Sequence, residues 1–299
     1  MRVDAVVHPL TVDDPQALRT LLERRCAELG HEFGAWRETT PADGGTGQAR
    51  AAVEAGADVV VVAGGDGTVM AVATALAHTG TALALLPTGT GNLLARNLEL
   101  PLELPAAVEV ALGGRPRQLD VGCATLDGDR ATVRRFTVMA GIGFDAAMMA
   151  DASPALKARL GWPAYVLSAV RHLRDDAMKC TIITDDGPPR QRRVRAVLVA
   201  NVGRLQGGVE LLPDARPDDG LLDVAVVAPR GPVDWLRVAG RVLRSSRVSD
   251  RRLERLRVRR VEVRTTRPRQ CEYDGDPVGR ATLLQVNVEP GALTVLLPR

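Results

Sequence analysis

Residues 59–68 read VVVVAGGDGT, a run of four valines that leads directly into a glycine-rich turn. Four consecutive β-branched residues favour a strand that is buried on both faces, as in a parallel sheet. The three glycines of the turn allow a tight change of direction. Thr68 is expected to cap the helix that follows, which has an apolar stripe. A turn of this kind points free N–H groups and the positive end of a helix at one spot, which suits phosphate.

The aspartate inside this turn indicates that a cation accompanies the phosphate. Asp66 would repel a phosphate group unless a cation lay between them, so the pattern also predicts Mg²⁺. We expect phosphate groups along the whole turn, which comprises Gly64, Gly65, Asp66, Gly67, Thr68, Val69 and Met70. The alternative is a structural turn in an ordinary α/β domain.

A second glycine-rich loop follows the next apolar strand. Residues 82–86 form that strand, and Pro87 ends it before the sequence Thr88-Gly89-Thr90-Gly91-Asn92. Loops that follow successive parallel strands lie side by side at the carboxyl ends of the sheet, where open α/β folds bind ligands. Two such loops are therefore stronger support for a binding site than either alone.

The rest of the chain divides into two regions that differ in their expected secondary structure. Up to residue 112, an expected strand over 2–8 alternates with helices over 15–30, 48–55 and 105–112, which favours a doubly wound parallel sheet. Further on, we expect a hairpin around Asp127-Gly128-Asp129, a helical interval over 145–174, and strands over 179–184, 192–201, 222–227, 257–264, 281–288 and 293–297. The strand-rich pattern of the second region is typical of a sandwich-like β-rich domain. The 299 residues therefore predict an α/β domain over 1–116 and a β-rich domain over 117–299, with the last strand free to return to the first.

Composition argues against several classes of protein. No apolar run approaches the roughly 18 residues of a membrane-spanning helix, and residues 1–4 do not begin a signal peptide, so we expect a cytoplasmic protein. The cysteines are isolated from one another, which argues against a zinc site or a disulfide framework. A homodimer stays open.

Positive charge gathers late in the chain. Residues 251–269 contain nine arginines and two glutamates. Such a stretch could meet an anionic lipid surface or a nucleic acid, or be a solvated strand face. Few aromatic residues are available to stack on bases, so we expect no nucleic-acid partner and a peripheral contact with an anionic membrane. Residues 161–173 could touch lipid, although a core helix is the better explanation of their apolar pattern, because amphipathic helices usually pack inward.

Further motifs follow the two loops in a fixed order. They are Gly141-Ile142-Gly143-Phe144-Asp145, Asn201-Val202 with Gly207-Gly208, Pro213-Asp214-Ala215, Asp219-Gly220-Leu221-Leu222-Asp223 and Asp274-Gly275-Asp276. Together with GGDGT and PTGTGN, they resemble the diacylglycerol kinase catalytic family, which also holds bacterial lipid kinases and the sphingosine and ceramide kinases. The GGDGT loop alone is similar in nicotinamide dinucleotide kinases and phosphofructokinases, whereas PTGTGN and DGLLD favour the lipid kinases.

The resemblance implies roles for particular residues. It implies a nucleotide-binding first domain, a lipid-binding second domain, ATP as phosphate donor and Mg²⁺ as cofactor. Nucleotide contacts are implied for Thr90, Gly91 and Asn92 of the second loop, and for Thr40 or its neighbour Thr39.

Two later motifs carry the remaining implied roles. A carboxylate of Asp274-Gly275-Asp276 would accept the proton of the lipid hydroxyl, and either aspartate could do so. A structural Mg²⁺ would be held by Asp219 with the backbone carbonyls of Arg216 and Leu221. On sequence alone, both segments also read as ordinary polar turns.

The chain departs from the family pattern at two places. The family commonly has Asn-Pro after its first strand, where this chain has His8-Pro9. The family motif Asp-Gly-Glu ends here in Asp276, which retracts the carboxylate by roughly 1.5 Å.

We therefore expect an ATP- and Mg²⁺-dependent lipid kinase that acts on a diacylglycerol-like or sphingoid-like hydroxyl at the inner face of the membrane. The alternatives are a soluble small-molecule kinase of the nicotinamide dinucleotide kinase type, and a module that binds nucleotide or lipid without catalysis.

Overall fold

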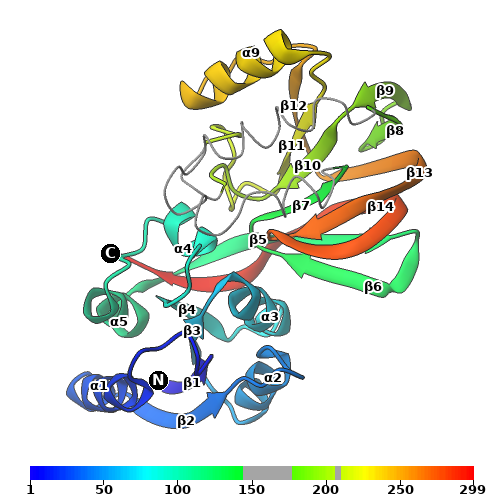
Figure 1. Cartoon of the computed structure of the whole chain (residues 1–299). Coiled ribbons are helices and arrows are strands. Elements are labelled where there is room, and N and C mark those ends of the chain that lie inside the picture. The colour runs from blue at the N-terminus through cyan, green and yellow to red at the C-terminus, as the bar shows by residue number, and fades with distance from the viewer. Residues whose placement is uncertain (144–176, 206–209) are drawn as a thin grey trace. The chain divides into compact units, whose positions relative to one another are not determined.

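The computed structural model describes residues 1–143, 177–205 and 210–299 (Figure 1). The chain divides into two compact units: unit 1 comprises Met1–Val121 and Pro290–Arg299, and unit 2 comprises Gly122–Glu289. The end of the chain thus belongs to unit 1, and strands β5 (Arg115–Leu126) and β14 (Asp276–Leu297) each contribute residues to both units. The expected helical interval over 145–174, the 161–173 segment and Gly207-Gly208 lie outside the described residues.

Unit 1 contains a parallel sheet with helices between its strands. Its strands follow the order β2-β1-β3-β4, all parallel, and Val295 of β14 pairs in parallel with Leu83 of β4. The other elements are β1 (Arg2–Val7), α1 (Pro15–Glu28), β2 (Glu32–Glu38), α2 (Thr46–Glu54), β3 (Val59–Gly64), α3 (Asp66–Leu76), β4 (Ala82–Pro87), α4 (Leu93–Asn97) and α5 (Leu104–Gly113). The expected α/β class is therefore confirmed.

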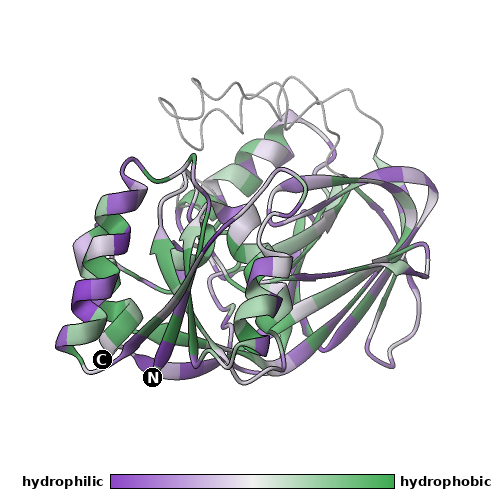
Figure 2. Ribbon diagram, turned by 90° about the horizontal axis from the view of Figure 1, so that it is seen from below, coloured by the Kyte–Doolittle hydropathy of each residue, from purple (hydrophilic) through white to green (hydrophobic). Residues whose placement is uncertain are grey.

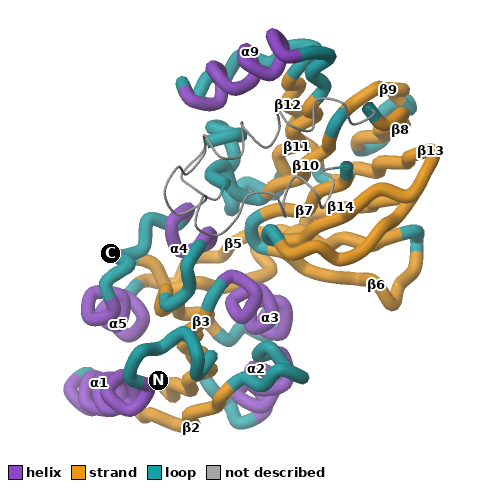
Figure 3. Tube along the Cα trace, viewed as in Figure 1, coloured by secondary structure: helices purple, strands orange, loops and turns teal. Residues whose placement is uncertain are grey.

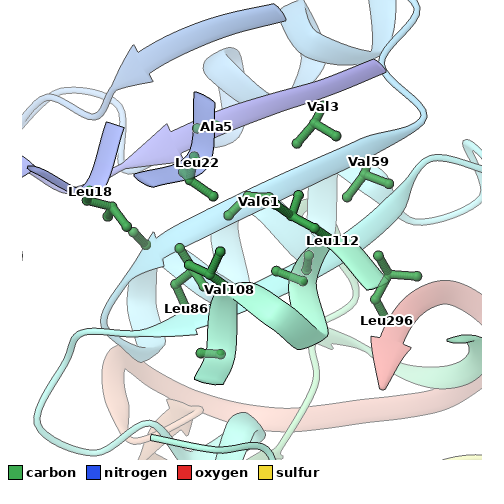
Figure 4. Packing of buried hydrophobic residues seen from close by; sticks show 14 of the residues in the cluster. Val3, Ala5, Leu18, Leu22, Val59, Val61, Leu86, Val108, Leu112 and Leu296 are labelled. Atoms are coloured by element: carbon green, nitrogen blue, oxygen red, sulfur yellow. The ribbon is translucent and has the colours of Figure 1, made fainter. Parts of the chain in front are cut away.

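The core of unit 1 explains why the valine run forms the middle strand. Every residue of β3 and of β4 is buried, as a strand covered on both faces requires. These strands consist mainly of hydrophobic residues, while the helices also carry hydrophilic residues (Figure 2). Figure 4 shows the packing of strand side chains from Val3, Ala5, Val59, Val61, Leu86 and Leu296 with helix side chains from Leu18, Leu22, Val108 and Leu112.

The start of α3 differs from the expectation. The helix begins at Asp66, with Gly65 at the N-cap position in an extended conformation (φ −83°, ψ −178°) and no side chain capping it. Thr68 is therefore not the cap; it lies in the first turn and is buried. The sequence signal was misleading because a threonine is a common cap, whereas here glycine fills that position.

Unit 2 is built mainly of strands (Figure 3), and its paired strands are antiparallel. Its strands follow the order β12-β11-β10-β7-β13, with all neighbours antiparallel; β13 also pairs with β14 and with β8. The remaining elements are β6 (Asp129–Phe136), β7 (Met139–Ile142), β8 (Met178–Thr184), β9 (Arg190–Val194), β10 (Ala196–Ala200), β11 (Leu222–Val227), α9 (Pro232–Leu243), β12 (Leu253–Val258) and β13 (Arg260–Tyr273).

Several details of unit 2 correct the sequence prediction. The expected strand over 192–201 is two strands, separated at Arg195. The expected strand over 257–264 is also divided, between β12 and β13, whereas the last two expected strands are one, β14. Helix α9 was not expected at all, although Pro232 at its start and its apolar spacing are ordinary helix signals. Among the residues that the structure describes, no helix is long and apolar enough to cross a bilayer.

Candidate functional site

The first glycine-rich turn joins β3 to α3 with a very close backbone path. A β-carbon on Gly64 would lie 2.7 Å from the β-carbon of Thr68, so the buried threonine fits only against a glycine. The N–H groups of Gly67 and Thr68, in the first turn of α3, have no partner within the helix because no helical residue precedes them by a full turn. With no capping side chain, this helix end can offer its N–H groups to an anion.

The second loop lies directly against the first. A β-carbon on Gly89 would lie 2.5 Å from the α-carbon of Gly65, a separation that real β-carbons essentially never show. The backbone N–H of Leu93, the first residue of α4, donates to Oδ1 of Asp66 at 2.6 Å. Asp66 thus holds the start of α4 against the start of α3. The structure brings the two loops together at the carboxyl ends of β3 and β4, where the sequence placed them.

The second loop is held rigid by its own asparagine. Asn92 has a left-handed backbone (φ 49°), its Oδ1 accepts from Gly89 N–H at 2.9 Å, and its Nδ2 donates to the Gly89 carbonyl at 2.7 Å. Its amide is therefore engaged within the loop. Thr90 is exposed and Gly91 is half-buried.

An arginine that sequence reasoning overlooked lies beside this loop. Nε of Arg96 donates to the Gly91 carbonyl at 2.9 Å, which places a guanidinium next to the glycine-rich turn. The spacing could have revealed it, because a side chain five residues after Gly91 on a short helix can reach back over the turn.

The loop after β1 contributes a further contact. The Thr11 hydroxyl lies 3.0 Å from the Thr88 hydroxyl and 3.1 Å from the His8 carbonyl oxygen. The departure at His8 therefore lies in a segment that hydrogen bonds connect to the second glycine-rich loop. Thr11 was not among the predicted site residues.

The two threonines after β2 differ in exposure. Thr39 is buried and its N–H donates to the Val7 carbonyl, whereas Thr40 is exposed and its hydroxyl accepts from the N–H of Asp43 at 3.1 Å. The Asp43 carboxylate accepts from the N–H groups of Gly45 and Gly47 and so holds the start of α2. Thr40 is the better placed of the pair to meet a ligand.

In unit 2, Asp274 and Gly275 form the turn between β13 and β14. Both have positive φ angles, 48° and 92°, as a two-residue hairpin turn with a right-handed twist requires. Oδ1 of Asp274 accepts from the N–H groups of Val138 at 3.0 Å and Met139 at 2.7 Å, and Oδ2 accepts from Thr137 N–H at 3.2 Å. Asp274 is buried, so this carboxylate anchors the turn to the segment between β6 and β7.

Asp276 has a different environment from Asp274. It is exposed at the start of β14, paired across the strands with Tyr273, and within the described ranges its carboxylate has no hydrogen-bond partner. The structure thus separates two aspartates that the sequence left equivalent.

A third carboxyl group lies on the strand before this turn. Glu272 faces Gly141 of β7, and a β-carbon on that glycine would lie 2.9 Å from Oε1 of Glu272. Burial raises the pKa of Glu272 to about 7. The glycine of the Gly141-Ile142-Gly143 motif therefore makes room for an acid that holds its proton near neutral pH.

The predicted structural metal segment is organised by an arginine. The Asp219 carboxylate accepts from the Leu221 N–H at 3.1 Å and forms an ion pair with Arg257. Arg257 also lies 3.9 Å from the carboxylate of buried Asp223, whose pKa burial raises to about 6 against the opposing effect of this guanidinium. Arg216 is exposed on the same segment.

Metal-ligating side chains are sparse. Within residues 1–143, 177–205 and 210–299, no three His, Cys, Asp or Glu side chains gather closely enough to hold a metal ion. Asp219 with two backbone carbonyls would be a site with one carboxylate, and that carboxylate already has a cationic partner in Arg257. Asp66, in a glycine-rich turn beside an uncapped helix end, suits an ion that arrives together with a nucleotide's phosphates.

Comparison with known proteins agrees with this arrangement. Residues 14–124 match the model of the diacylglycerol kinase catalytic domain, and residues 136–297 match that of the YegS C-terminal NAD kinase beta sandwich-like domain. A Pseudomonas aeruginosa (strain UCBPP-PA14) protein named "Probable lipid kinase YegS-like" is 36% identical over 259 residues, covering 84% of this chain and 82% of that protein. A protein of the same name from Stenotrophomonas maltophilia (strain K279a) is 31% identical, covering 83% and 81%.

Solved structures extend the fold comparison. A diacylglycerol kinase from Bacillus anthracis str. Sterne superposes with a TM-score of 0.78 at 22% identity, covering 99% of this chain and 96% of that one. An NAD kinase from Archaeoglobus fulgidus in complex with ATP is more distant, with a TM-score of 0.50 at 14% identity. The two domain matches and the relatives above 30% identity show that this chain belongs to the diacylglycerol kinase catalytic-domain family of lipid kinases, in its YegS-like group, and that it is a kinase.

Proposed function

We propose that this protein transfers the γ-phosphoryl group of ATP to the hydroxyl group of a membrane lipid, with Mg²⁺ as cofactor. The observation that carries the proposal is the uncapped start of α3, held against a second glycine-rich loop by the Gly65–Gly89 approach and by the Asp66–Leu93 hydrogen bond. Phosphoryl transfer depends on positioning and on neutralising charge rather than on covalent help from the protein, and rigid backbone N–H groups supply both.

The nucleotide would lie along these loops. The turn from Gly64 to Met70 would face its phosphates, with backbone N–H groups of the first turn of α3 as donors, and the Thr40 hydroxyl and residues 90–92 would contact it from neighbouring segments. Because the Asn92 amide is engaged with Gly89, the contribution of Asn92 would be to shape the loop. Arg96 would provide the positive side chain that a P-loop lysine provides elsewhere.

Mg²⁺ would be held by Asp66 and the nucleotide, and when bound it would neutralise the phosphate oxygens. Asp66 contributes a fixed carboxylate because its hydrogen bond to Leu93 N–H limits its movement. A second, structural Mg²⁺ at Asp219 with the carbonyls of Arg216 and Leu221 stays a prediction, and it would have to displace or join Arg257.

The lipid hydroxyl would lose its proton to Asp276. A general base must be able to approach the substrate, and Asp276 is exposed, whereas both oxygens of Asp274 are occupied by backbone N–H groups. Asp274 would act as a positioning residue that fixes the turn. The acceptor would be diacylglycerol-like or sphingoid-like, met by peripheral contact with the anionic inner face of the membrane.

The test is transfer of ³²P from γ-labelled ATP to extracted total lipid in mixed micelles, with and without Mg²⁺. Labelled lipid that depends on Mg²⁺ and disappears in Asp276→Asn is the expected result, and the mobility of the product identifies the acceptor class. A panel of soluble acceptors, including nicotinamide dinucleotide, run beside it would reveal a soluble-substrate kinase. Nucleotide binding without transfer to any acceptor would instead indicate a non-catalytic module.

A further inference from the structure

Helix α9 of unit 2 has an unusual outward face. Val233, Leu236 and Leu243 are 60%, 64% and 67% exposed, while Val238, Ala239 and Val242 of the same helix are buried. In Figure 1, α9 lies next to β12, the edge strand of the order described above. The helix therefore has one apolar side against its own unit and a second apolar side facing solvent.

The exposed apolar residues form one continuous stripe. Positions 233, 236, 240 and 243 recur at intervals of three and four, so they lie on one face of a helix, and Gly240 adds no polar group between them. Pro232 is also exposed and begins the helix. Single exposed leucines are common, but a stripe of this length along one helix is a contiguous patch, and such patches mark interaction surfaces.

Arginines border this stripe. Arg237 and Arg244 follow it around the helix, both exposed, and residues 230–252 contain seven arginines against two aspartates. Those two aspartates already form ion pairs: Asp234 with Arg252 and, at 3.7 Å, with Arg237, and Asp250 with Arg241 and Arg252. In the described parts of the chain, Arg244 has no acidic partner, so the border of the stripe carries unneutralised positive charge.

Helix α1 provides the contrast within the same molecule. It buries Leu18, Leu22 and Cys26 and presents Arg19, Glu23 and other polar or small side chains to solvent, as a surface helix ordinarily does. A second, exposed apolar face distinguishes α9 from this arrangement.

We propose that the stripe Pro232–Val233–Leu236–Gly240–Leu243 of α9 is the surface by which this protein docks on anionic lipid. The helix lies in the plane of the interface, its leucines and valine at the boundary between headgroups and acyl chains, and Arg237 and Arg244 at the lipid phosphates. This inference rests on the proposed function, since a kinase of membrane lipids needs a way to reach its substrate.

The charge pattern favours lipid over a second copy of the chain. A symmetric dimer through this stripe would bring each copy's Arg237 and Arg244 toward those of the other, because the same patch meets itself across a two-fold axis. No further acid on α9 would offset that repulsion, since Asp234 is already shared between Arg252 and Arg237, and Arg244 would still meet its symmetry mate unneutralised. An anionic surface supplies the missing counter-charge without this penalty.

The experiment is co-sedimentation of the full chain with vesicles of phosphatidylglycerol and phosphatidylcholine in equal parts, beside vesicles of phosphatidylcholine alone. Leu236→Gln/Leu243→Gln should lower affinity for the anionic vesicles at least about tenfold, because two leucines no longer enter the interface. Arg237→Gln/Arg244→Gln should lower it by about tenfold at low salt and by less as salt rises. Leu29→Gln, at a leucine 41% exposed at the end of α1, is the matched control and should bind as wild type.

Two further measurements separate loss of docking from loss of folding or of catalysis. Thermal melts of the variants should match wild type, because all four positions are exposed. Phosphorylation of a short-chain diacylglycerol dispersed as monomers should be unchanged in Leu236→Gln/Leu243→Gln, since the lesion is in docking. If wild type phosphorylates no lipid yet still sediments through Leu236 and Leu243, the proposed function fails and the docking surface stands.

The proposal is overturned if wild type does not sediment with anionic vesicles, or if the double leucine variant sediments as wild type does. Sedimentation equilibrium without lipid tests whether a second copy of the chain covers the stripe instead. If wild type is a dimer, the leucine variant is a monomer and vesicle binding is unchanged, the stripe is a dimer interface.

Discussion

The aspartate-containing turns of the two units use their carboxylates differently. In unit 1, one residue, Asp66, both ties two loops together through Leu93 N–H and carries the charge beside the uncapped helix end. In unit 2, two residues divide these tasks: Asp274 is buried on backbone N–H groups, and Asp276 is exposed. Truncation of Asp66 should therefore remove the tie between the loops and the catalytic charge together. In unit 2, the structural role and the catalytic role can be removed separately, by substitution of Asp274 or of Asp276.

The largest effect is expected at Asp66. Asp66→Ala removes the charge and the acceptor for Leu93 N–H, and Asp66→Asn removes the charge but keeps an oxygen that can accept that bond. Both should lower kcat by about a thousandfold or more, because the phosphate charge is no longer neutralised. Only Asp66→Ala should also lower the free energy of unfolding, by about 1 kcal/mol, measured by urea denaturation. Near-normal turnover in Asp66→Asn would mean that Asp66 only connects the two loops and that its charge is not needed for catalysis.

The turn of unit 2 should separate the two losses cleanly. Asp276→Asn should lower kcat by about 10²- to 10³-fold with unchanged stability, since the side chain is exposed and only its basicity is removed. Asp274→Asn should cost about 3 kcal/mol of stability, because an amide cannot accept at both ends where a carboxylate meets N–H groups of residues 137–139.

The left-handed backbone conformation of position 274 does not explain the loss of stability expected for Asp274→Asn. Asparagine tolerates the left-handed conformation of position 274 as readily as aspartate does. Urea denaturation and steady-state kinetics on both variants test the division, and the reverse pattern, with stability lost at 276 and turnover lost first at 274, would refute it.

Features that depend on local sequence patterns could be predicted from the sequence, and most of unit 1 is of this kind. The valine run, the two glycine-rich loops and their neighbourhood followed from local pattern, because a buried parallel strand and a tight turn impose strong constraints on residue type. Thr68 as a cap was wrong because Gly65 takes that position, and the α-helix signal around Pro232 was missed between strand patterns.

The long-range contacts could not be predicted from pattern. Nothing local distinguishes Asp274 from Asp276: the difference comes from residues 137–139, more than a hundred positions away, whose N–H groups meet one carboxylate and not the other. The pairing of Asp219 with Arg257 is of the same kind. Such partners become visible only when the strands are placed in register.

A smaller effect tests whether the loops of unit 1 must touch. Gly89→Ala places a β-carbon 2.5 Å from the Gly65 α-carbon, so the loops must separate and the Asp66–Leu93 bond must lengthen. We expect a loss of about 2 kcal/mol in stability and weaker ATP binding by calorimetry. Gly113→Ala, which meets nothing within 4 Å, is the control and should be neutral or stabilising by up to about 1 kcal/mol. Equal behaviour of the two variants would mean that the close approach is not required.

The smallest expected effect concerns the acid beside the turn of unit 2. In the folded protein, burial raises the pKa of Glu272 to about 7, whereas in the unfolded chain it loses its proton near the ordinary value of 4.5. The folded state therefore binds more protons between these values, so the free energy of unfolding falls as pH rises from about 4.5 to 7 and levels off above. With partial exposure to solvent, we expect a fall of about 1 kcal/mol between pH 5 and 8.

Glu272→Gln should remove that slope, so the variant should match wild type at pH 5 and exceed it in stability at pH 8. Asp223, whose pKa burial raises to about 6, contributes a slope of the same sign, but it is present in both proteins and cancels in their difference. Urea denaturation of both proteins at the two pH values measures this difference directly. If the variant and wild type lose stability in parallel, the carboxyl of Glu272 is already ionised in the folded state, and the room that Gly141 leaves for it serves packing alone.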